Sequence, residues 1–87
     1  MKVKDMHGIL VDVEKVRVEA GRNSDGVPDY FVKGIEYTLV GFERVHYLFY
    51  TKDVDKALDY SAQLNEAIEL GLRFDQENQE PEEVPFS

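Results

Sequence analysis

The chain of 87 residues is 43% hydrophobic and 32% charged, carries a net charge of −8 at pH 7 and contains no cysteine. This length allows one domain with a modest core, and the missing cysteine excludes disulfides, thiolate metal sites and a thiol nucleophile. The acidity opposes binding to bare nucleic-acid backbone or anionic lipid, so a basic protein is the expected partner. The charge is uneven, because residues 1–51 carry seven Lys/Arg against eight Asp/Glu and residues 52–87 carry three against ten.

The N-terminal part is predicted to form a strand. Apolar and polar residues alternate over residues 9–20, which is the period of a half-buried strand. The alternation slips by one residue near Glu14 and Lys15, so we expect a bulge or tight bend there. The apolar run contains Asp12, unlike a signal peptide or a membrane span, and we therefore expect a cytoplasmic protein. Segment 21–29 is dense in turn-forming residues and is expected to be a loop.

Residues 30–51 are rich in aromatic and β-branched residues and are interrupted by Gly41, which predicts a β-hairpin. Glycine at the first loop position favours a type II′ turn at Gly41 and Phe42, with Val40 opposite Glu43. This register places on one face Phe31, Ile35, Tyr37, Leu39, His46, Leu48 and Tyr50. The other face would carry Val32, Thr38, Val45, Tyr47 and Phe49. Both faces are partly apolar, so the hairpin is expected to be central, with a helix covering one face and a second cover on the other.

From Asp53 the apolar period changes to that of a helix. The expected buried stripe comprises Val54, Ala57, Leu58, Ser61, Leu64, Ala67, Ile68 and Gly71. We expect Asp53 to cap a helix that extends to Arg73. The predicted fold class is α+β, with an antiparallel sheet of three to four strands followed by one long C-terminal helix packed on one sheet face. Residues 1–74 would form this single domain, and residues 75–87, with five acids and no base, an acidic flexible tail.

Four acids of the predicted helix fall in one stripe opposite the apolar one. They are Asp55, Asp59, Glu66 and Glu69. A solvated helix commonly carries Lys or Arg four residues after an acid, and in this stripe only Glu69 and Arg73 have that spacing. The stripe is therefore either an ordinary solvated face or an anionic surface that binds a basic partner protein and imitates the phosphates of a nucleic acid.

The aromatic hairpin supports a second hypothesis, an oligomer interface. Soluble monomers rarely expose a large apolar patch, so a sheet face left uncovered by the helix would dimerise. The residues expected at that interface are Val32, Val45, Tyr47 and Phe49. The same aromatic run could stack on single-stranded nucleic acid. The candidate cations for that role are Arg17, Arg22, Lys33 and Arg44, which are dispersed and form a poor electrostatic funnel.

The end of the chain reads Glu82-Glu83-Val84-Pro85-Phe86-Ser87. This segment resembles the acidic tip, ending in an apolar residue, proline and phenylalanine, of bacterial single-stranded-DNA-binding proteins. Ser87 displaces the terminal carboxylate that the partners of that family hold, and the rest of the chain does not resemble the family. The resemblance implies that Glu82, Glu83 and Phe86 contact a basic, hydrophobic pocket of a replication or repair protein. The alternative is an unstructured end.

No sequence motif indicates catalysis, a metal or a cofactor. His7 and His46 lack metal-ligand spacing, the serines lack a nucleophile-elbow context, and the glycines form no phosphate-binding loop. We expect a small acidic, non-catalytic protein-binding module, similar in size and charge to inhibitors from phages and mobile elements that occupy a basic surface of a partner. The alternatives are a structural or accessory homo-oligomer that uses its aromatic sheet face, and a weak single-stranded nucleic-acid binder.

Overall fold

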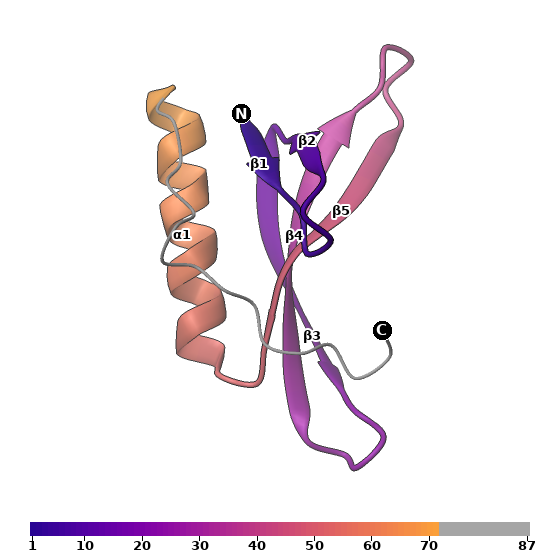
Figure 1. Cartoon of the computed structure of the whole chain (residues 1–87), viewed down its shortest axis with the longest axis vertical. Coiled ribbons are helices and arrows are strands. Elements are labelled where there is room, and N and C mark those ends of the chain that lie inside the picture. The colour runs from indigo at the N-terminus through magenta and orange to yellow at the C-terminus, as the bar shows by residue number, and fades with distance from the viewer. Residues whose placement is uncertain (72–87) are drawn as a thin grey trace.

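The computed structural model describes residues 1–71, which form five strands and one helix. In chain order these are β1 (Lys2–Lys4), β2 (Leu10–Asp12), β3 (Lys15–Arg22), β4 (Pro28–Tyr37), β5 (Glu43–Thr51) and α1 (Val54–Leu70). Strands β3, β4 and β5 form an antiparallel sheet with β4 in the centre, and β1 and β2 form a separate antiparallel pair. Figure 1 shows α1 and the β1–β2 pair side by side along the larger sheet. The α+β class predicted from the sequence is confirmed.

The β1–β2 pair is fastened to both β4 and β5 by backbone hydrogen bonds. The N–H of Met6 donates to the carbonyl of Tyr47 (3.0 Å), and the N–H of Glu14 donates to the carbonyl of Ile35 (2.8 Å). The predicted bend near Glu14 and Lys15 is confirmed, because the chain leaves β2 and enters β3 there. Val3 and Val13 pack in one buried cluster with Ala57, Tyr60 and Leu64 of α1, so the pair and α1 cover the same side of the sheet.

The β3–β4 loop is shorter than predicted. Gly21 pairs with Asp29 and Arg22 with Pro28, so the strands extend into the segment expected to be a loop. Only residues 23–27 connect them.

The β4–β5 turn also differs from the predicted one. Tyr37, rather than Val40, lies opposite Glu43, so residues 38–42 form the loop. Gly41 is at the turn as expected, with a φ of 87° that glycine adopts without steric cost. Because the register moves by an odd number of residues, the two faces of β5 near the turn are exchanged relative to β4.

A bulge on β5 then shifts the register a second time. Val32 lies opposite Phe49 and Lys33 opposite Tyr47, which leaves Leu48 as the extra residue. The combined shift is even, so beyond the bulge Val32 and Phe49 share a face, as predicted. That face is the one α1 covers, and both side chains are buried in the core. Val32 and Phe49 were predicted to lie in an oligomer interface. That prediction is wrong for these two residues, because α1 covers them, whereas Tyr47 lies on the opposite side of the sheet.

The core lies between the sheet and the layer formed by α1 and the β1–β2 pair. The residues packed together there are Val3, Val13, Val16, Val32, Leu48, Phe49, Ala57, Tyr60 and Leu64. Phe49 stacks on Tyr60, with ring centroids 4.5 Å apart and planes 14° apart. Val54 and Leu58 of the predicted helix stripe are exposed, because the buried side of α1 is rotated towards Tyr60.

The ends of α1 are defined by two caps. The side chain of Asp53 accepts from the backbone N–H groups of Asp55 (2.9 Å) and Lys56 (3.4 Å), which confirms the predicted N-cap. Gly71 ends the helix in the left-handed conformation, with a φ of 68°. The helix thus ends before Arg73, the predicted limit.

Asn65 joins α1 to the outer edge of β3. Its side-chain oxygen accepts from the N–H of Val16 (3.1 Å), and its side-chain nitrogen donates to the carbonyl of the same residue (3.0 Å). These two bonds satisfy the edge backbone as a neighbouring strand would. They also fix the rotation of α1 about its axis, and with it the direction of the exposed helix face.

Candidate partner-binding surfaces

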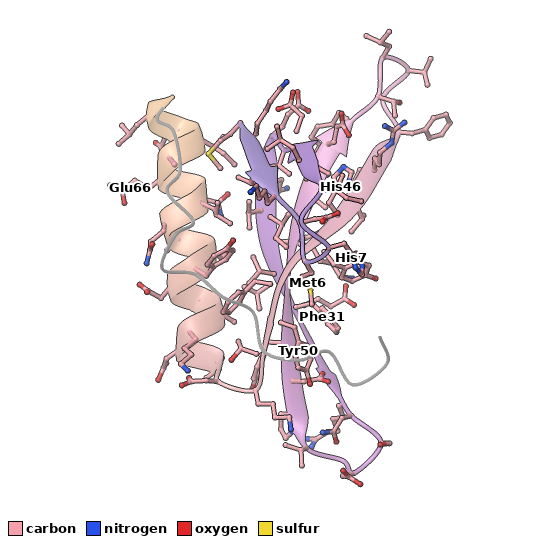
Figure 2. The ribbon with its side chains drawn as sticks, viewed as in Figure 1. Met6, His7, Phe31, His46, Tyr50 and Glu66 are labelled. Atoms are coloured by element: carbon pink, nitrogen blue, oxygen red, sulfur yellow. The ribbon has the colours of Figure 1, made fainter. Side chains whose placement is uncertain are left out.

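The acidic helix face, defined as Asp55, Asp59, Glu66 and Glu69, lies opposite the buried side of α1. All four residues are exposed, and Figure 2 shows Glu66 projecting from the helix away from the sheet. The 3.6-residue period of a helix places them in one stripe, and core packing on the other side holds that stripe outward. The structure brings these four predicted residues together on one rigid element.

No ion pair neutralises the acidic helix face within residues 1–71. Asp59 accepts a hydrogen bond from the side-chain amide of Gln63 (2.9 Å), and the four acids have no salt bridge there. On the sheet, three cations are paired with carboxylates. These pairs join Lys33 to Glu19 (2.6 Å), Arg17 to Glu43 (2.7 Å) and Arg44 to Glu36 (3.7 Å). Four carboxylates without an ion pair in the described part of the chain therefore share one face of the helix.

Two of the four acids stand at the unfavourable end of the helix. Glu69 lies in the last turn of α1 and Glu66 just before it, and the last turn contains no basic residue. Carbonyl dipoles at a helix C-terminus favour cations and disfavour carboxylates. The two acids therefore lower the stability of the helix end at which they lie.

Replacing Glu69 by lysine is expected to raise the free energy of unfolding by about 0.3–1 kcal/mol at low salt. The lysine would complement the negative end of the helix instead of opposing it. Asp55→Lys is the matched control, because the same reversal in the first turn should lower the stability by a similar amount. Urea denaturation of both variants measures the difference, and a Glu69→Lys variant less stable than the wild type would contradict the argument.

The outer sheet face is the side of β3, β4 and β5 turned away from α1. It contains Val45 and Tyr47, which are 42% and 45% exposed. These two residues of the predicted oligomer interface are accessible, whereas Val32 and Phe49 lie on the covered side. The structure thus divides the predicted interface into two accessible and two buried residues.

Charged side chains cover part of the outer sheet face. The Lys33 ammonium lies 5.1 Å from the ring centroid of Tyr47. Arg17 on β3 and Glu43 on β5 are joined at 2.7 Å, and the strand register places Ile35 of the central strand between them. This pair accounts for the complete burial of Ile35. Lys33 and Arg17 on this face are each paired with a carboxylate, which lowers the positive charge that they would offer to a nucleic acid.

The β4–β5 loop presents apolar side chains, two of which, Leu39 and Val40, were predicted to lie in a strand. Leu39 is fully exposed, and Val40 and Phe42 are 77% and 72% exposed. Thr38 holds the loop closed, because its N–H donates to the carbonyl of Phe42 (2.9 Å) and its carbonyl accepts from the N–H of Gly41 (3.0 Å). The apolar residues on both sides of Gly41 were the sequence feature that could have indicated this exposed loop, because such a run is compatible with a loop as well as with a strand.

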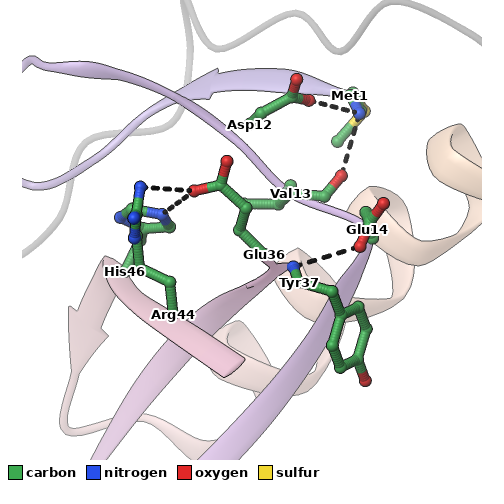
Figure 3. A network of polar contacts seen from close by, with 8 residues as sticks. All are labelled: Met1, Asp12, Val13, Glu14, Glu36, Tyr37, Arg44 and His46. Carbon is green, nitrogen blue, oxygen red and sulfur yellow. Dashed lines mark hydrogen bonds and ion pairs between the residues drawn. The ribbon is translucent and has the colours of Figure 1, made fainter. Parts of the chain in front are cut away.

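Polar contacts near the N-terminus have a structural role (Figure 3). Glu36 on β4 lies 3.1 Å from the imidazole Nε2 of His46 and 3.7 Å from the guanidinium of Arg44. The N-terminal ammonium of Met1 lies 3.2 Å from a carboxylate oxygen of Asp12. The contacts of Glu36 link β4 to β5. The contact of Met1 with Asp12 links the residue before β1 to the end of β2.

The two histidines do not come together in one site. The N–H of His7 donates to Asp5 in the β1–β2 loop (2.8 Å), whereas His46 contacts Glu36 on the sheet. Across residues 1–71, no group of three or more His, Asp or Glu residues is arranged to hold a metal ion. The helix found in this part of the chain is too short and too polar to cross a membrane.

The predicted tail contacts Glu82, Glu83 and Phe86 lie outside the described residues. No protein family model, curated protein or solved structure matches the chain.

Proposed function

We propose that the protein is a non-catalytic protein-binding module whose acidic helix face binds a basic surface of another protein. The observation that carries this proposal is the alignment of four exposed acids without an ion pair on one face of α1, whereas three cations of the sheet are paired with carboxylates. Leu58 is exposed on the same helix and offers an apolar contact beside the charges. A cytoplasmic location belongs to this proposal, since a chain without cysteine suits a reducing compartment.

The spacing of the acids favours a protein partner with a few separate cations over a groove built for duplex DNA. Asp55 and Glu69 are fourteen residues apart in α1, a span of about 21 Å at the rise of a helix. Duplex DNA carries one charge per about 1.7 Å of its axis, so four carboxylates over this span are much sparser. An inhibitor of this kind would match individual Lys or Arg side chains and would not reproduce the whole polyelectrolyte.

Reversing the acidic helix face is expected to weaken partner binding at least about tenfold. The wild-type chain would capture its basic partner from host lysate, and titration calorimetry would compare the purified partner with Asp55→Lys/Asp59→Lys/Glu66→Lys/Glu69→Lys. Circular dichroism would check that the variant keeps its helix, which is expected because all four side chains are exposed. Unchanged affinity, or capture of no basic protein, would contradict the proposal.

A second candidate function is self-association through the outer sheet face. The exposure of Tyr37, Val45 and Tyr47 supports it, because each is a large apolar or aromatic side chain more than two-fifths exposed. On this hypothesis the acids only maintain solubility, and the fourfold helix reversal leaves the assembly unchanged. Light scattering on the wild type and on Tyr47→Ala tests it, with a change of mass supporting self-association.

A further inference from the structure

The edge of β3 that points away from β4 is closed by a side chain at one place and is open further along. In an antiparallel ladder, alternate residues turn both their N–H and their C=O to the same side. Val16 turns both groups outward, to the side-chain amide of Asn65, and the register of β3 with β4 is unbroken. Val18 and Ala20 therefore turn their backbone groups to the same outer edge, where no other group within residues 1–71 hydrogen-bonds to them.

The open edge, residues 18–21, lacks the features that commonly protect a strand from a neighbour. Edges are often blunted by proline, by lysine, by a bulge or by a covering segment. This segment reads Val-Glu-Ala-Gly, its register contains no bulge, and residues 19–21 are exposed. The side chain of Glu19 is held on the outer sheet face by Lys33 at 2.6 Å. The backbone of the open edge is therefore accessible to another chain.

One row of side chains on α1 faces this edge. Residues 54, 58, 61 and 65 follow one another at spacings of four, three and four, so they lie along one side of the helix. The bonds from Asn65 to Val16 direct that side towards β3. Ser61 is buried, whereas Val54 and Leu58 are 42% and 53% exposed. Two apolar side chains of the row that faces β3 are thus exposed to solvent.

Leu58 lies level with the open edge. Strands β3 and β5 run in the same direction, since both are antiparallel to β4, and α1 follows β5 and runs back along the sheet (Figure 1). Leu58 precedes Asn65 by seven residues, which is about 10 Å along a helix, and three residues of a strand also span about 10 Å. Counted from the contact of Asn65 with Val16, Leu58 is therefore about level with residues 18–20.

The open edge and the two exposed side chains of α1 together fit an extended segment of another chain. An added strand bonds to the backbone of a sheet edge, and contacts to every second side chain give specificity. In an antiparallel pair, opposed residues carry their side chains on the same face. Val18 packs against the core on the α1 side, and Ala20 shares its face. Every second side chain of an added strand would therefore meet Leu58 or Val54 and should be apolar.

The surrounding charges favour a basic segment. Glu69 and Asp55 follow the row around α1 on its solvent side and belong to the acidic helix face, whose acids have no ion pair within residues 1–71. The charged residue that β3 places on the helix side is Arg22, at the far end of the open edge, and its guanidinium donates to the carbonyl of Gly26 (2.8 Å). A second copy is disfavoured, because pairing two β3 edges antiparallel would place both acidic helix faces on one side of the joined sheet.

We propose that the β3–α1 site, defined as the open edge with Val54 and Leu58, binds an extended basic segment of the partner protein as an additional antiparallel strand. Every second residue of that segment is apolar and contacts Leu58 or Val54, and the basic residues between them are attracted by the acidic helix face. The identity of the partner rests on the proposed function, whereas the pairing with the strand edge is a separate contact.

The test is amide hydrogen exchange, followed by NMR on the ¹⁵N-labelled full chain with an acetylated and amidated heptapeptide of alternating lysine and valine. We expect exchange at Val18 and Ala20 to slow at least about tenfold at saturation, because their N–H groups become hydrogen-bonded. The expected dissociation constant is on the order of 0.1–1 mM. The matched control is the same heptapeptide N-methylated at its valines, which keeps the charge and the side chains but has no donor for β3.

Two results would overturn the proposal. One is equal slowing with both peptides, or none with either. The other is slow exchange at Val18 and Ala20 in the peptide-free chain that is lost on dilution, because it would assign the open edge to a second copy.

Two variants test the roles of the residues. Ala20→Pro removes an outward N–H at an edge position where proline is tolerated, and should weaken heptapeptide binding at least about threefold. Ala20→Ser keeps the N–H and should bind as the wild type does. Leu58→Ser removes the apolar contact and should also weaken binding at least about threefold. Because Leu58 is exposed, this variant should fold, and wild-type affinity in it would overturn the assignment even if Ala20→Pro does not fold.

Failure of the β3–α1 site is distinguishable from failure of the proposed function. A captured partner complex that is lost on helix reversal but kept by Ala20→Pro and Leu58→Ser would overturn the β3–α1 site alone. A complex that is lost in those two variants but kept on helix reversal would support the strand pairing and overturn the helix proposal.

Discussion

Replacing Gly34 by alanine is expected to lower the free energy of unfolding by about 2–3 kcal/mol, the upper part of the range for overpacked cores. A Cβ at this position would lie 2.4 Å from a methyl carbon of Val13 and 2.9 Å from one of Leu48. Both neighbours are buried side chains with little space to move. For a domain of this size, the melting temperature should fall by roughly 8–24 °C.

Removing the clashing methyl groups provides the control for this prediction. In a Val13→Ala background the added Cβ gains space, so the cost of Gly34→Ala should become smaller than in the wild type. A double-mutant cycle by urea denaturation measures the coupling between the two positions, which is expected to be at least about 0.5 kcal/mol. Additive effects would show that Val13 does not press on Gly34, contrary to the packing described above.

Phe49→Ala is expected to be among the most damaging substitutions, with a loss of about 3–5 kcal/mol. The ring is buried against Tyr60 of α1, so its removal leaves a cavity between the sheet and the helix. Tyr47→Ala is the matched control, two residues away on the same strand and 45% exposed; it should cost about 1 kcal/mol. Similar losses in the two variants, measured by urea denaturation, would contradict the assignment of the two residues to opposite faces.

The sequence pattern alone did not predict correctly which residues of the hairpin share a face of the sheet. Val32 and Phe49 are apolar at strand spacing, and so are Val45 and Tyr47, so the pattern assigns all four to one face. Two features decide otherwise, the loop 38–42 and the bulge at Leu48. Each depends on how the strands pack against α1 and the β1–β2 pair, and a shift of one residue moves a side chain to the other face.

The helix was more predictable than the sheet. Its period of 3.6 residues fixes which side chains share a face regardless of tertiary contacts, so the four acids were grouped correctly and Asp53 was identified as the cap. The buried side was rotated from the prediction, since Tyr60 with its large ring displaces Leu58 from the core. The end at Gly71 depends on a left-handed backbone conformation, which a glycine permits but does not require.

The pairing of Gly21 with Asp29 could not be predicted from the sequence. Both residues are common in turns, so they were assigned to a loop. In the structure they lie opposite each other across β3 and β4, and Asp29 is buried. Residues of two strands become neighbours only through the register of the sheet.

We propose that fixed charges on α1, rather than the net charge of the chain, bind the partner. The most direct measurement compares two variants of equal net charge, one with Asp55, Asp59, Glu66 and Glu69 changed to lysine and one with Glu77, Glu80, Glu82 and Glu83 changed to lysine. Calorimetric titration of the captured partner at one salt concentration should give at least about a tenfold loss of affinity for the helix variant and a smaller loss for the other. Equal losses, or a greater loss for the second variant, would contradict the account.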